Sequence, residues 1–327
     1  MKAIIPVAGY GKRMRPHTLT QPKVLLPVAD KPMIAHIVEK LIEDGVDELI
    51  FVVGYLGDRI EAFIKKTYPI KSHFVEQKEF LGLGHAIYTA NSFLNDEPIF
   101  IVLGDTIYDV DLKGVIQGKN SSLGTRKVTD PRRFGVVLMD NNGYIEKLME
   151  KPKNFISDIA LVGIYYFKSG HSLNEALSTL INENIKTKNE YQLTDALQIM
   201  IDEGEKFEIF NVNGWYDCGK TETLLETNAI ILKRDFMHHS FKVENSIIVP
   251  PVYIHPSAKV ISSIIGPNVT IGEKSNIENA IVSESIINSN SSIRKINMKS
   301  SLIGMNVQIE GEGKTLNLGD YSHLTIY

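Results

Sequence analysis

The repeat in the last quarter of the chain limits the fold more than any other sequence feature. Beyond about Val249 an apolar residue recurs at every fifth or sixth position, and Ser, Asn, Gly and Lys fill most of the gaps. Neither the helical nor the strand period gives this spacing. One inward residue per side of a triangular coil does, which is the hexapeptide-type pattern of left-handed parallel β-helices. Eleven positions follow it and predict slightly under four coils: Ile254, Val260, Ile265, Ile271, Ile277, Val282, Ile287, Ile293, Met298, Ile303 and Ile309. The alternative is an irregular all-β tail.

The preceding part of the chain alternates between strand-like and helix-like patterns. Expected strands cover residues 3–7, 48–53, 73–76 and 99–103, and expected helices cover residues 32–44, 56–66 and 83–94. This βαβα order predicts an α/β fold with a doubly wound, mostly parallel, Rossmann-like sheet. We therefore expect two domains, residues 1–235 with the sheet and residues 236–327 with the β-helix. Ligands of such sheets bind beyond the carboxyl ends of the strands.

Composition narrows the possible partners and the compartment. The 327 residues carry a net charge of -4, with 43% hydrophobic and 23% charged residues, as in ordinary soluble proteins. We therefore expect no nucleic-acid partner and no membrane partner. No segment approaches the run of about 20 apolar residues that spans a bilayer. The single cysteine, Cys218, fits a reducing cytoplasm, where we expect the protein to reside.

A glycine-rich and basic loop follows the first expected strand. Residues 9–16 read GYGKRMRP, and Lys23 follows shortly afterwards. Glycines let backbone N–H groups approach a phosphate closely, while Arg13 and Arg15 add positive charge. The loop does not match G-x-x-x-x-G-K-[ST], and Met14 breaks the G-x-G-x-x-G pattern. The residues alone therefore indicate a phosphate-binding loop of another kind, or a tight turn with solvated cations.

Residues 9–18, 22–28 and 31–33 together resemble the signature of the sugar-phosphate nucleotidyltransferases. Further segments resemble later motifs of that family, in the same order along the chain: 81–86 (LGLGHA), 103–105 (LGD), 150–152 (EKP), 190–195 (EYQLTD) and 214–219 (GWYDCG). The chain is most similar to long-form glucose-1-phosphate thymidylyltransferases, which add a β-helical tail. The resemblance covers nearly the whole chain and is strongest up to about residue 230.

The resemblance implies an Mg²⁺-dependent reaction between a nucleoside triphosphate and a sugar-1-phosphate, in which pyrophosphate leaves. It implies that Arg13 and Lys23 contact the triphosphate, and that Asp105 and Asp217 hold the metal. Two carboxylates with phosphate oxygens and waters suit the octahedral preference of Mg²⁺. Instead of binding a metal, either aspartate could have a purely structural role in a turn or as a helix cap. We assign the neighbouring Asp109 and Asp111 to that alternative.

The same resemblance implies two sets of binding residues. The nucleotide-binding set is Ala8, Gly9, Gly11, Gln77 and Gly82. The sugar-phosphate-binding set is Gly135, Glu150, Lys151 and Lys188. A glutamine amide offers one donor and one acceptor, which match the imide edge shared by uracil and thymine.

Departures from the family pattern leave the substrate pair open. The loop at residues 9–11 is one residue shorter than usual, Lys12 replaces Ser or Thr, and Lys188 replaces a frequent arginine. Residues 5–9 also resemble uridylyltransferases. We expect dTTP and glucose-1-phosphate, with UTP as the alternative and guanylyl transfer as a weaker one. A catalytically silent regulatory subunit is the alternative of another class, and the presence of all four catalytic candidates argues against it.

The tail and the histidines carry no catalytic prediction. The β-helix has His255 near its start and His323 near its end, with none between them. We therefore expect the tail to form a homo-oligomer or to pack on the catalytic domain, rather than to hold a second active site. We interpret His17, His36, His85 and His255 as loop or packing residues, and residues 165–167 as strand core.

Overall fold

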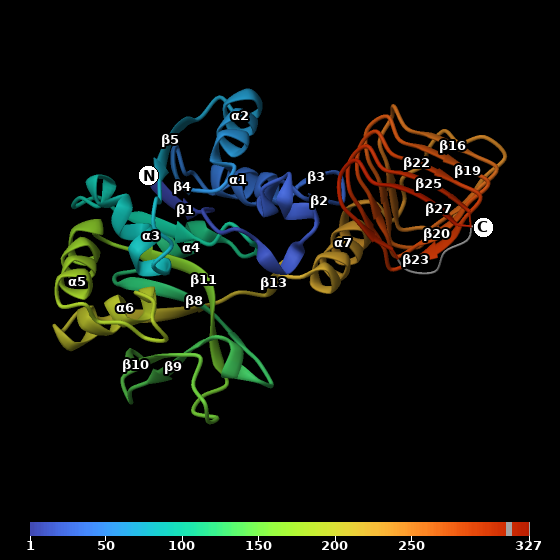
Figure 1. Ribbon diagram of the computed structural model, residues 1–327. Coiled ribbons are helices and arrows are strands. Elements are labelled where there is room, and N and C mark those ends of the chain that lie inside the picture. Colours follow the sequence, from blue (N-terminus) through green and yellow to red (C-terminus); the bar gives the residue numbers. More distant parts are fainter. Residues whose placement is uncertain (312–315, 327) are drawn as a thin grey trace. The chain divides into compact units, whose positions relative to one another are not determined.

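The computed structural model describes residues 1–311 and 316–326, and it contains two compact units (Figure 1). The first unit comprises residues 1–9 and 37–215, and the second comprises residues 10–36 and 216–327. The secondary structure changes from α/β to β-helical after α7 (Thr221–Asp235). The compact units follow a different division, because residues 10–36 and α7 group with the β-helix.

The parallel half of the sheet in the first unit contains all four expected strands. β1 pairs in parallel with β6 and β4, and β4 pairs in parallel with β5. The apolar runs of β1, β4 and β6 are buried on both faces, as parallel strands between helices require, whereas β5 at the edge of the sheet is half-buried. The bounds are β1 Lys2–Pro6, β4 Glu48–Val53, β5 Lys71–Glu76 and β6 Ile99–Val102.

Antiparallel strands extend this sheet. β11 runs antiparallel to β6, β8 and β9, and β10 runs antiparallel to β9, while β12 pairs with β8 in parallel. Tyr165, Tyr166 and Phe167 on β11 are buried, so their interpretation as strand core is confirmed. The parallel-rich α/β fold is confirmed, and the antiparallel strands are an addition to it. The bounds are β8 Ser121–Lys127, β9 Gly135–Met139, β10 Ile145–Glu150, β11 Ile159–Phe167 and β12 Phe207–Asn211.

The helices agree with the amphipathic patterns except at one end. α3 stops at Thr89 rather than at residue 94, and a 3-10 turn follows at Asn91–Phe93. Asn91 and Ser92 compete with the helical backbone for hydrogen bonds, which favours a stop there. No helix within the described residues is long and apolar enough to cross a bilayer. The bounds are α1 Met33–Glu43, α2 Gly57–Thr67, α3 Leu83–Thr89, α4 Leu112–Ile116, α5 Gly170–Asn182 and α6 Leu193–Asp202.

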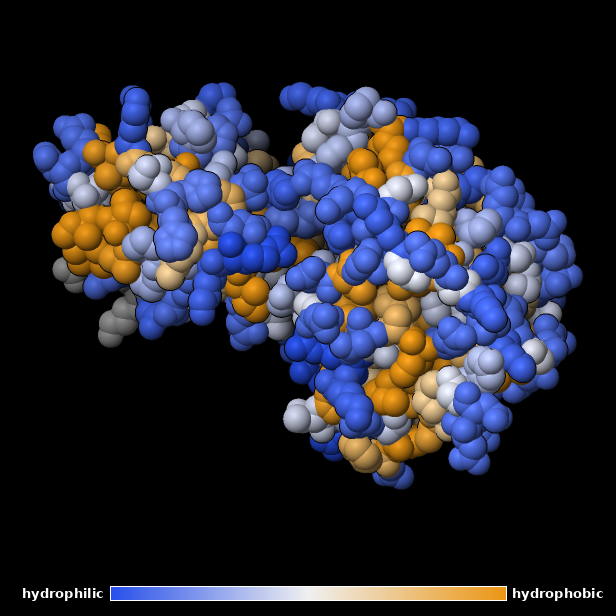
Figure 2. Space-filling view, turned by 180° about the vertical axis from the view of Figure 1, so that it is seen from behind, coloured by the Kyte–Doolittle hydropathy of each residue, from blue (hydrophilic) through white to orange (hydrophobic). Residues whose placement is uncertain are grey.

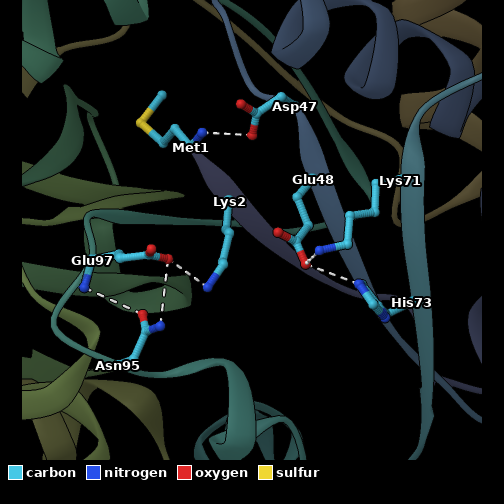
Figure 3. Close-up of polar contacts among 8 residues, drawn as sticks. All are labelled: Met1, Lys2, Asp47, Glu48, Lys71, His73, Asn95 and Glu97. Atoms are coloured by element: carbon cyan, nitrogen blue, oxygen red, sulfur yellow. Dashed lines mark hydrogen bonds and ion pairs between the residues drawn. The ribbon is translucent and has the colours of Figure 1, made fainter.

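Ion pairs cover the amino ends of β1, β4 and β5 (Figure 3). The Met1 ammonium lies 2.6 Å from Asp47 Oδ1, and its hydrogen bond lowers the pKa of that carboxyl group. Glu48 bridges Lys71 and His73 at 3.0 and 2.9 Å. Because parallel strands share their carboxyl edge, these pairs lie at the edge opposite Ala8 and Asp105.

The tail in the second unit is a left-handed parallel β-helix. Its three sheets have the orders β14-β17-β20-β23, β15-β18-β21-β24-β26 and β16-β19-β22-β25-β27. All eleven spaced apolar residues are buried, which confirms the repeat. Residues with a left-handed backbone, many of them asparagine, occupy corners between strands, where asparagine is tolerated.

The β-helix is longer than the expected count of slightly under four coils. Within the described residues four coils have all three sides, and β26 and β27 belong to a fifth. The count was low because the eleven positions leave out Ile248 on β14 at the start, and Leu318 and Leu324 on β26 and β27, which fall outside the regular spacing. The strands are Ile247–Ile248, Val252–Ile254, Lys259–Ile261, Ile264–Ile265, Val269–Ile271, Asn276–Glu278, Ile281–Ser283, Ile286–Ile287, Ser292–Arg294, Asn297–Lys299, Leu302–Ile303, Gln308–Gly311, Asn317–Leu318 and His323–Ile326, β14 to β27 in order.

Candidate active site

The loop after β1 folds into consecutive 3-10 turns at Lys12–Met14, His17–Leu19 and Lys23–Leu25, followed by the short strands β2 (Pro27–Val28) and β3 (Lys31–Pro32). Gly11 has a left-handed backbone with φ of 60°, and a Cβ there would lie 2.9 Å from Thr18 Cγ2 and 3.1 Å from Lys23 Cβ. The Thr18 hydroxyl also donates to Gly11 O at 2.9 Å. Because residue 11 is a glycine, Thr18 and the Cβ of Lys23 can pack directly against the backbone of the loop at this position.

Arg13 and Asp217 lie together in the second unit, although they are far apart in sequence. Asp217 ends β13 (Gly214–Asp217) and accepts a hydrogen bond from the Gly219 N–H at 2.9 Å. The position of a Cβ on Gly219 lies 2.8 Å from Asp217 Oδ1 and 3.0 Å from Arg13 Nη2. The turn role considered for Asp217 therefore exists, and it holds the carboxylate next to an exposed guanidinium.

The buried side chain of Met14 anchors the turn that carries Arg13. Asp217 itself is half-buried. An arginine guanidinium and a carboxylate side by side, both reachable by solvent, can neutralise phosphate charge and ligate a cation, respectively.

Asp105 belongs to the carboxyl edge of the sheet in the first unit. It follows β6, while Ala8 and Gly9 follow the adjacent parallel strand β1. Asp105 is half-buried, and β7 (Thr106–Asp109) starts directly after it. Asp111 caps α4 by accepting the Lys113 N–H at 3.0 Å, so its structural assignment is confirmed.

The two expected metal ligands fall in different compact units, Asp105 in the first and Asp217 in the second. In the part of the chain that the structure describes, no group of three or more His, Cys, Asp or Glu side chains is placed to hold a metal. The donor chemistry is that of two carboxylates, which are ligands that Mg²⁺ accepts together with phosphate oxygens and waters.

Gln77 lies at the carboxyl end of β5 and is buried. Its N–H donates to Val53 O at 2.8 Å, and its Nε2 lies 3.1 Å from His85 Nδ1 and 3.4 Å from Gly82 O. Burial lowers the pKa of the His85 imidazole, which favours the neutral ring that can accept from the amide. The amide of Gln77 is thus held in one orientation.

Gly82 is the third residue of the group that contains Gln77 and His85. Its φ is 115°, and a Cβ there would lie 2.6 Å from Tyr191 O. Both the conformation and the close backbone approach require glycine. Sequence reasoning included Gln77 and Gly82 but interpreted His85 as a loop or packing residue, and missed its contact with Gln77.

The four expected sugar-phosphate residues form one neighbourhood in the first unit. Gly135 and Glu150 are paired across β9 and β10, and Glu150 Oε1 lies 2.8 Å from Lys151 Nζ. Lys188 Nζ donates to Lys151 O at 2.9 Å. Thr194 donates to Glu150 Oε2 at 3.3 Å, a contact that sequence reasoning missed although the residue lies in the quoted 190–195 segment.

Both lysines of this neighbourhood have strained backbones. Lys151 has φ of 46° and Lys188 has φ of 57°, in the left-handed region that non-glycine residues rarely adopt. Such conformations cost about 1–3 kcal/mol and occur preferentially at functional sites. At Lys188 this conformation belongs to the tight turn that is closed by backbone hydrogen bonds between Thr187 and Glu190.

Three further histidines have local partners. His36 is buried with its Nε2 2.9 Å from Val28 O, as expected of a packing residue. On the β-helix, His255 Nδ1 lies 2.9 Å from Ser257 Oγ, and His323 Nδ1 lies 3.1 Å from Gln308 Oε1.

The fold and these motifs define a nucleotidyl transferase domain followed by a hexapeptide-repeat domain. The chain belongs to the nucleotidyl transferase family, whose profile matches residues 2–234. A second profile, for the GlmU-like C-terminal hexapeptide domain, matches residues 222–293.

Individual relatives carry several names. The chain is 37% identical over 72% of its length to bifunctional protein GlmU of Methanocaldococcus jannaschii, and 31% identical over 71% to glucose-1-phosphate thymidylyltransferase of Streptomyces griseus. It spans 55% and 66% of the lengths of those two proteins. A solved UDP-glucose pyrophosphorylase, in complex with UDP-glucose, aligns with a TM-score of 0.60 and 28% identity over 71% of this chain and 98% of its own.

Proposed function

We propose that this protein is a sugar-1-phosphate nucleotidyltransferase that joins glucose-1-phosphate to dTTP and releases pyrophosphate. The observation that carries the proposal is the placement of the Arg13 guanidinium and the Asp217 carboxylate at the same turn, around Gly219. The resemblance implies a phosphate oxygen of the sugar-1-phosphate as the attacking group and the α-phosphorus of the triphosphate as its target. Such a reaction needs positioning and charge neutralisation more than a protein nucleophile.

Each expected residue then has a physical role. Arg13 and Lys23 contact the triphosphate and balance the charge that grows on the departing pyrophosphate. Glu150 accepts hydrogen bonds from sugar hydroxyls, and Lys151 and Lys188 bind the sugar phosphate. Asp105 and Asp217 are the residues that would hold Mg²⁺, which when bound neutralises phosphate charge.

The choice of base rests on Gln77. Its N–H groups are bonded to His85 and Gly82, so its amide oxygen is the group that can accept the imide N–H of a pyrimidine, which does not separate thymine from uracil. The relative named glucose-1-phosphate thymidylyltransferase supports the first possibility, and the solved UDP-glucose pyrophosphorylase supports the second. We place dTTP first and UTP second.

The test is pyrophosphate release with Mg²⁺ across a grid of nucleoside triphosphates and sugar-1-phosphates. We expect the fastest release with dTTP and glucose-1-phosphate. Arg13→Ala and Lys23→Ala should each lower kcat/KM about 100-fold or more, as expected when a charge-stabilising donor is removed. Arg234→Ala, which removes an exposed arginine paired with Asp235, serves as the control.

Other outcomes have definite meanings. A preference for UTP would keep the reaction and change the base. No release from any pair by folded protein would instead favour a catalytically silent regulatory subunit.

We also propose that the protein forms a cytoplasmic homo-oligomer. Ile247, Ile264 and Ile281 are aligned on one sheet of the β-helix, and 61%, 37% and 45% of their surfaces are exposed. Hydrophobic residues also gather on the face of the β-helix visible in Figure 2. Contiguous exposed apolar surface is typical of interaction sites. The proposed location rests on the lone cysteine, Cys218.

A further inference from the structure

The loop that carries Arg13 and Lys23 is attached by side chains to the last part of the β-helix. His17 Nε2 lies 2.6 Å from Asn317 Oδ1 on β26. The Thr20 hydroxyl donates a short hydrogen bond to Asp320 Oδ2, in the turn that follows β26. The loop contributes His17 and Thr20, and the β-helix contributes Asn317 and Asp320. Because two contacts are made, the 17–20 turn is fixed both in position and in orientation.

The attachment is closely packed, and it is buried on the side of His17, whereas Asn317 is exposed. His17 is 1% exposed, and burial lowers the pKa of its imidazole although Asn317 and Asp320 favour the protonated ring. The position of a Cβ on Gly319 lies 3.1 Å from Pro16 Cβ, so this corner of the β-helix packs directly against the loop.

Asp320 is itself rigidly held. Its second oxygen, Oδ1, accepts the Met305 N–H at 2.6 Å, from the preceding coil. The carboxylate of Asp320 therefore binds the preceding coil with one oxygen and Thr20 of the loop with the other.

A second attachment lies further along the same segment. Asn228 on α7 is fully buried, and its Oδ1 accepts both the Ala29 N–H and the Thr270 hydroxyl, each at 2.8 Å. One amide oxygen thereby joins the segment after Lys23, the helix α7 and strand β18. Residues 10–36 are thus fastened to the β-helix at two places.

We propose that the last coil of the β-helix positions the triphosphate-binding loop, with Asn317 and Asp320 as positioning residues for Arg13 and Lys23. Lys23 follows Thr20 by three residues and Arg13 precedes His17 by four, so a shift of the 17–20 turn displaces both cations. A misplacement of about 1 Å can cost about 100-fold in rate. This inference rests on the proposed function, because it assigns a purpose to the loop.

Two variants test the attachment from its two sides. Asn317→Ala removes the partner of His17, and Thr20→Val removes the hydroxyl while leaving the bond between Asp320 and Met305 intact. Thr20→Ser keeps the hydroxyl and should restore wild-type behaviour. Asn297→Ala, the same exchange at an exposed position of strand β23, is the matched control.

We expect the KM for dTTP to rise about tenfold or more in Asn317→Ala and Thr20→Val, with the KM for glucose-1-phosphate unchanged. Amide hydrogen exchange of residues 12–25 should accelerate in the full-length variants, while their melting temperatures stay near that of the wild type. Exchange and both KM values equal to those of the wild type would overturn the proposal. So would an equal rise of both KM values, or a lowered melting temperature, because either indicates a purely structural role.

The exchange measurement also separates the two proposals. If the wild type releases no pyrophosphate from any pair, the proposed function fails. The attachment of the loop is still decided by the exchange of residues 12–25 in the variants.

Discussion

Gly219 and Gly82 each lie beside candidate site residues, but a methyl group would meet different neighbours at each. At Gly219 the nearest atoms are the ends of the Asp217 and Arg13 side chains, which can rotate away. At Gly82 the nearest atom is the backbone oxygen of Tyr191, and the left-handed φ adds strain. A side chain at Gly219 would therefore disturb the arrangement of the Asp217 and Arg13 charges. A side chain at Gly82 would disturb the backbone.

We predict that Gly219→Ala lowers kcat/KM for the nucleotidyl transfer by about tenfold or more and leaves the melting temperature unchanged. Gly82→Ala should lower the melting temperature, because strained substitutions of this kind destabilise by about 1–3 kcal/mol. Gly114→Ala, where a Cβ meets nothing within 4 Å, is the control for both measurements. Full activity of Gly219→Ala would show that activity does not depend on this arrangement of Arg13 and Asp217.

Sequence reasoning at the residue scale found the residues with distinctive chemistry in ordered motifs, such as Arg13, Lys23 and Glu150. It did not find the residues that hold them. His85 contacts Gln77, Thr194 contacts Glu150, and Gly219 leaves room for Arg13. Such partners are ordinary residue types, so only their position in space distinguishes them.

Within the β-helix, serine side chains form hydrogen bonds with the backbone at the corners between strands. Ser285 is fully buried, and its hydroxyl donates to Ser283 O at 2.6 Å and accepts the Ser301 N–H at 3.0 Å. Ser301 in turn accepts the Leu316 N–H at 3.0 Å. The hydroxyls satisfy backbone groups where the chain turns between strands, which is why small polar residues recur beside the apolar ones.

We predict that Ser285→Ala destabilises the protein by about 1–3 kcal/mol, because it leaves the Ser301 N–H buried without an acceptor. Denaturant unfolding followed by far-ultraviolet circular dichroism would measure the change. Ser300→Ala, which removes a bond to the half-exposed side chain of Glu284, should cost less than about 0.5 kcal/mol. Equal stabilities of the two variants would contradict the role assigned to the corner serines.

At the scale of the whole molecule, the relevant feature is a row of three exposed isoleucines on one sheet of the β-helix, here called the isoleucine ladder. Ile247, Ile264 and Ile281 are paired through successive coils, whereas the next coil presents Asn297 in the same register. Contiguous exposed apolar surface is typical of interaction sites, and the ladder is therefore the surface at which we propose contact with a second copy.

We predict that Ile264→Glu combined with Ile281→Glu lowers the mass measured by analytical ultracentrifugation to that of a monomer. The apolar contact would bring glutamates together in the assembled form, which is unfavourable. Phe155→Glu, at a residue with 65% of its surface exposed in the first unit, should leave the mass unchanged. A wild-type protein that is already monomeric would contradict the proposed oligomer.

The sequence by itself determined the class of fold, because the spacing of apolar residues along the chain predicts which of them are buried. The apolar run of residues 48–53 and the spaced residues from Ile254 to Ile309 are buried as their patterns predicted. Only the tertiary structure placed residues 10–36 with the β-helix, and Asn317 beside His17. It also decided the antiparallel pairing of β11 with β6 and β8. These features depend on the register between segments distant in sequence, which packing sets and no local pattern records.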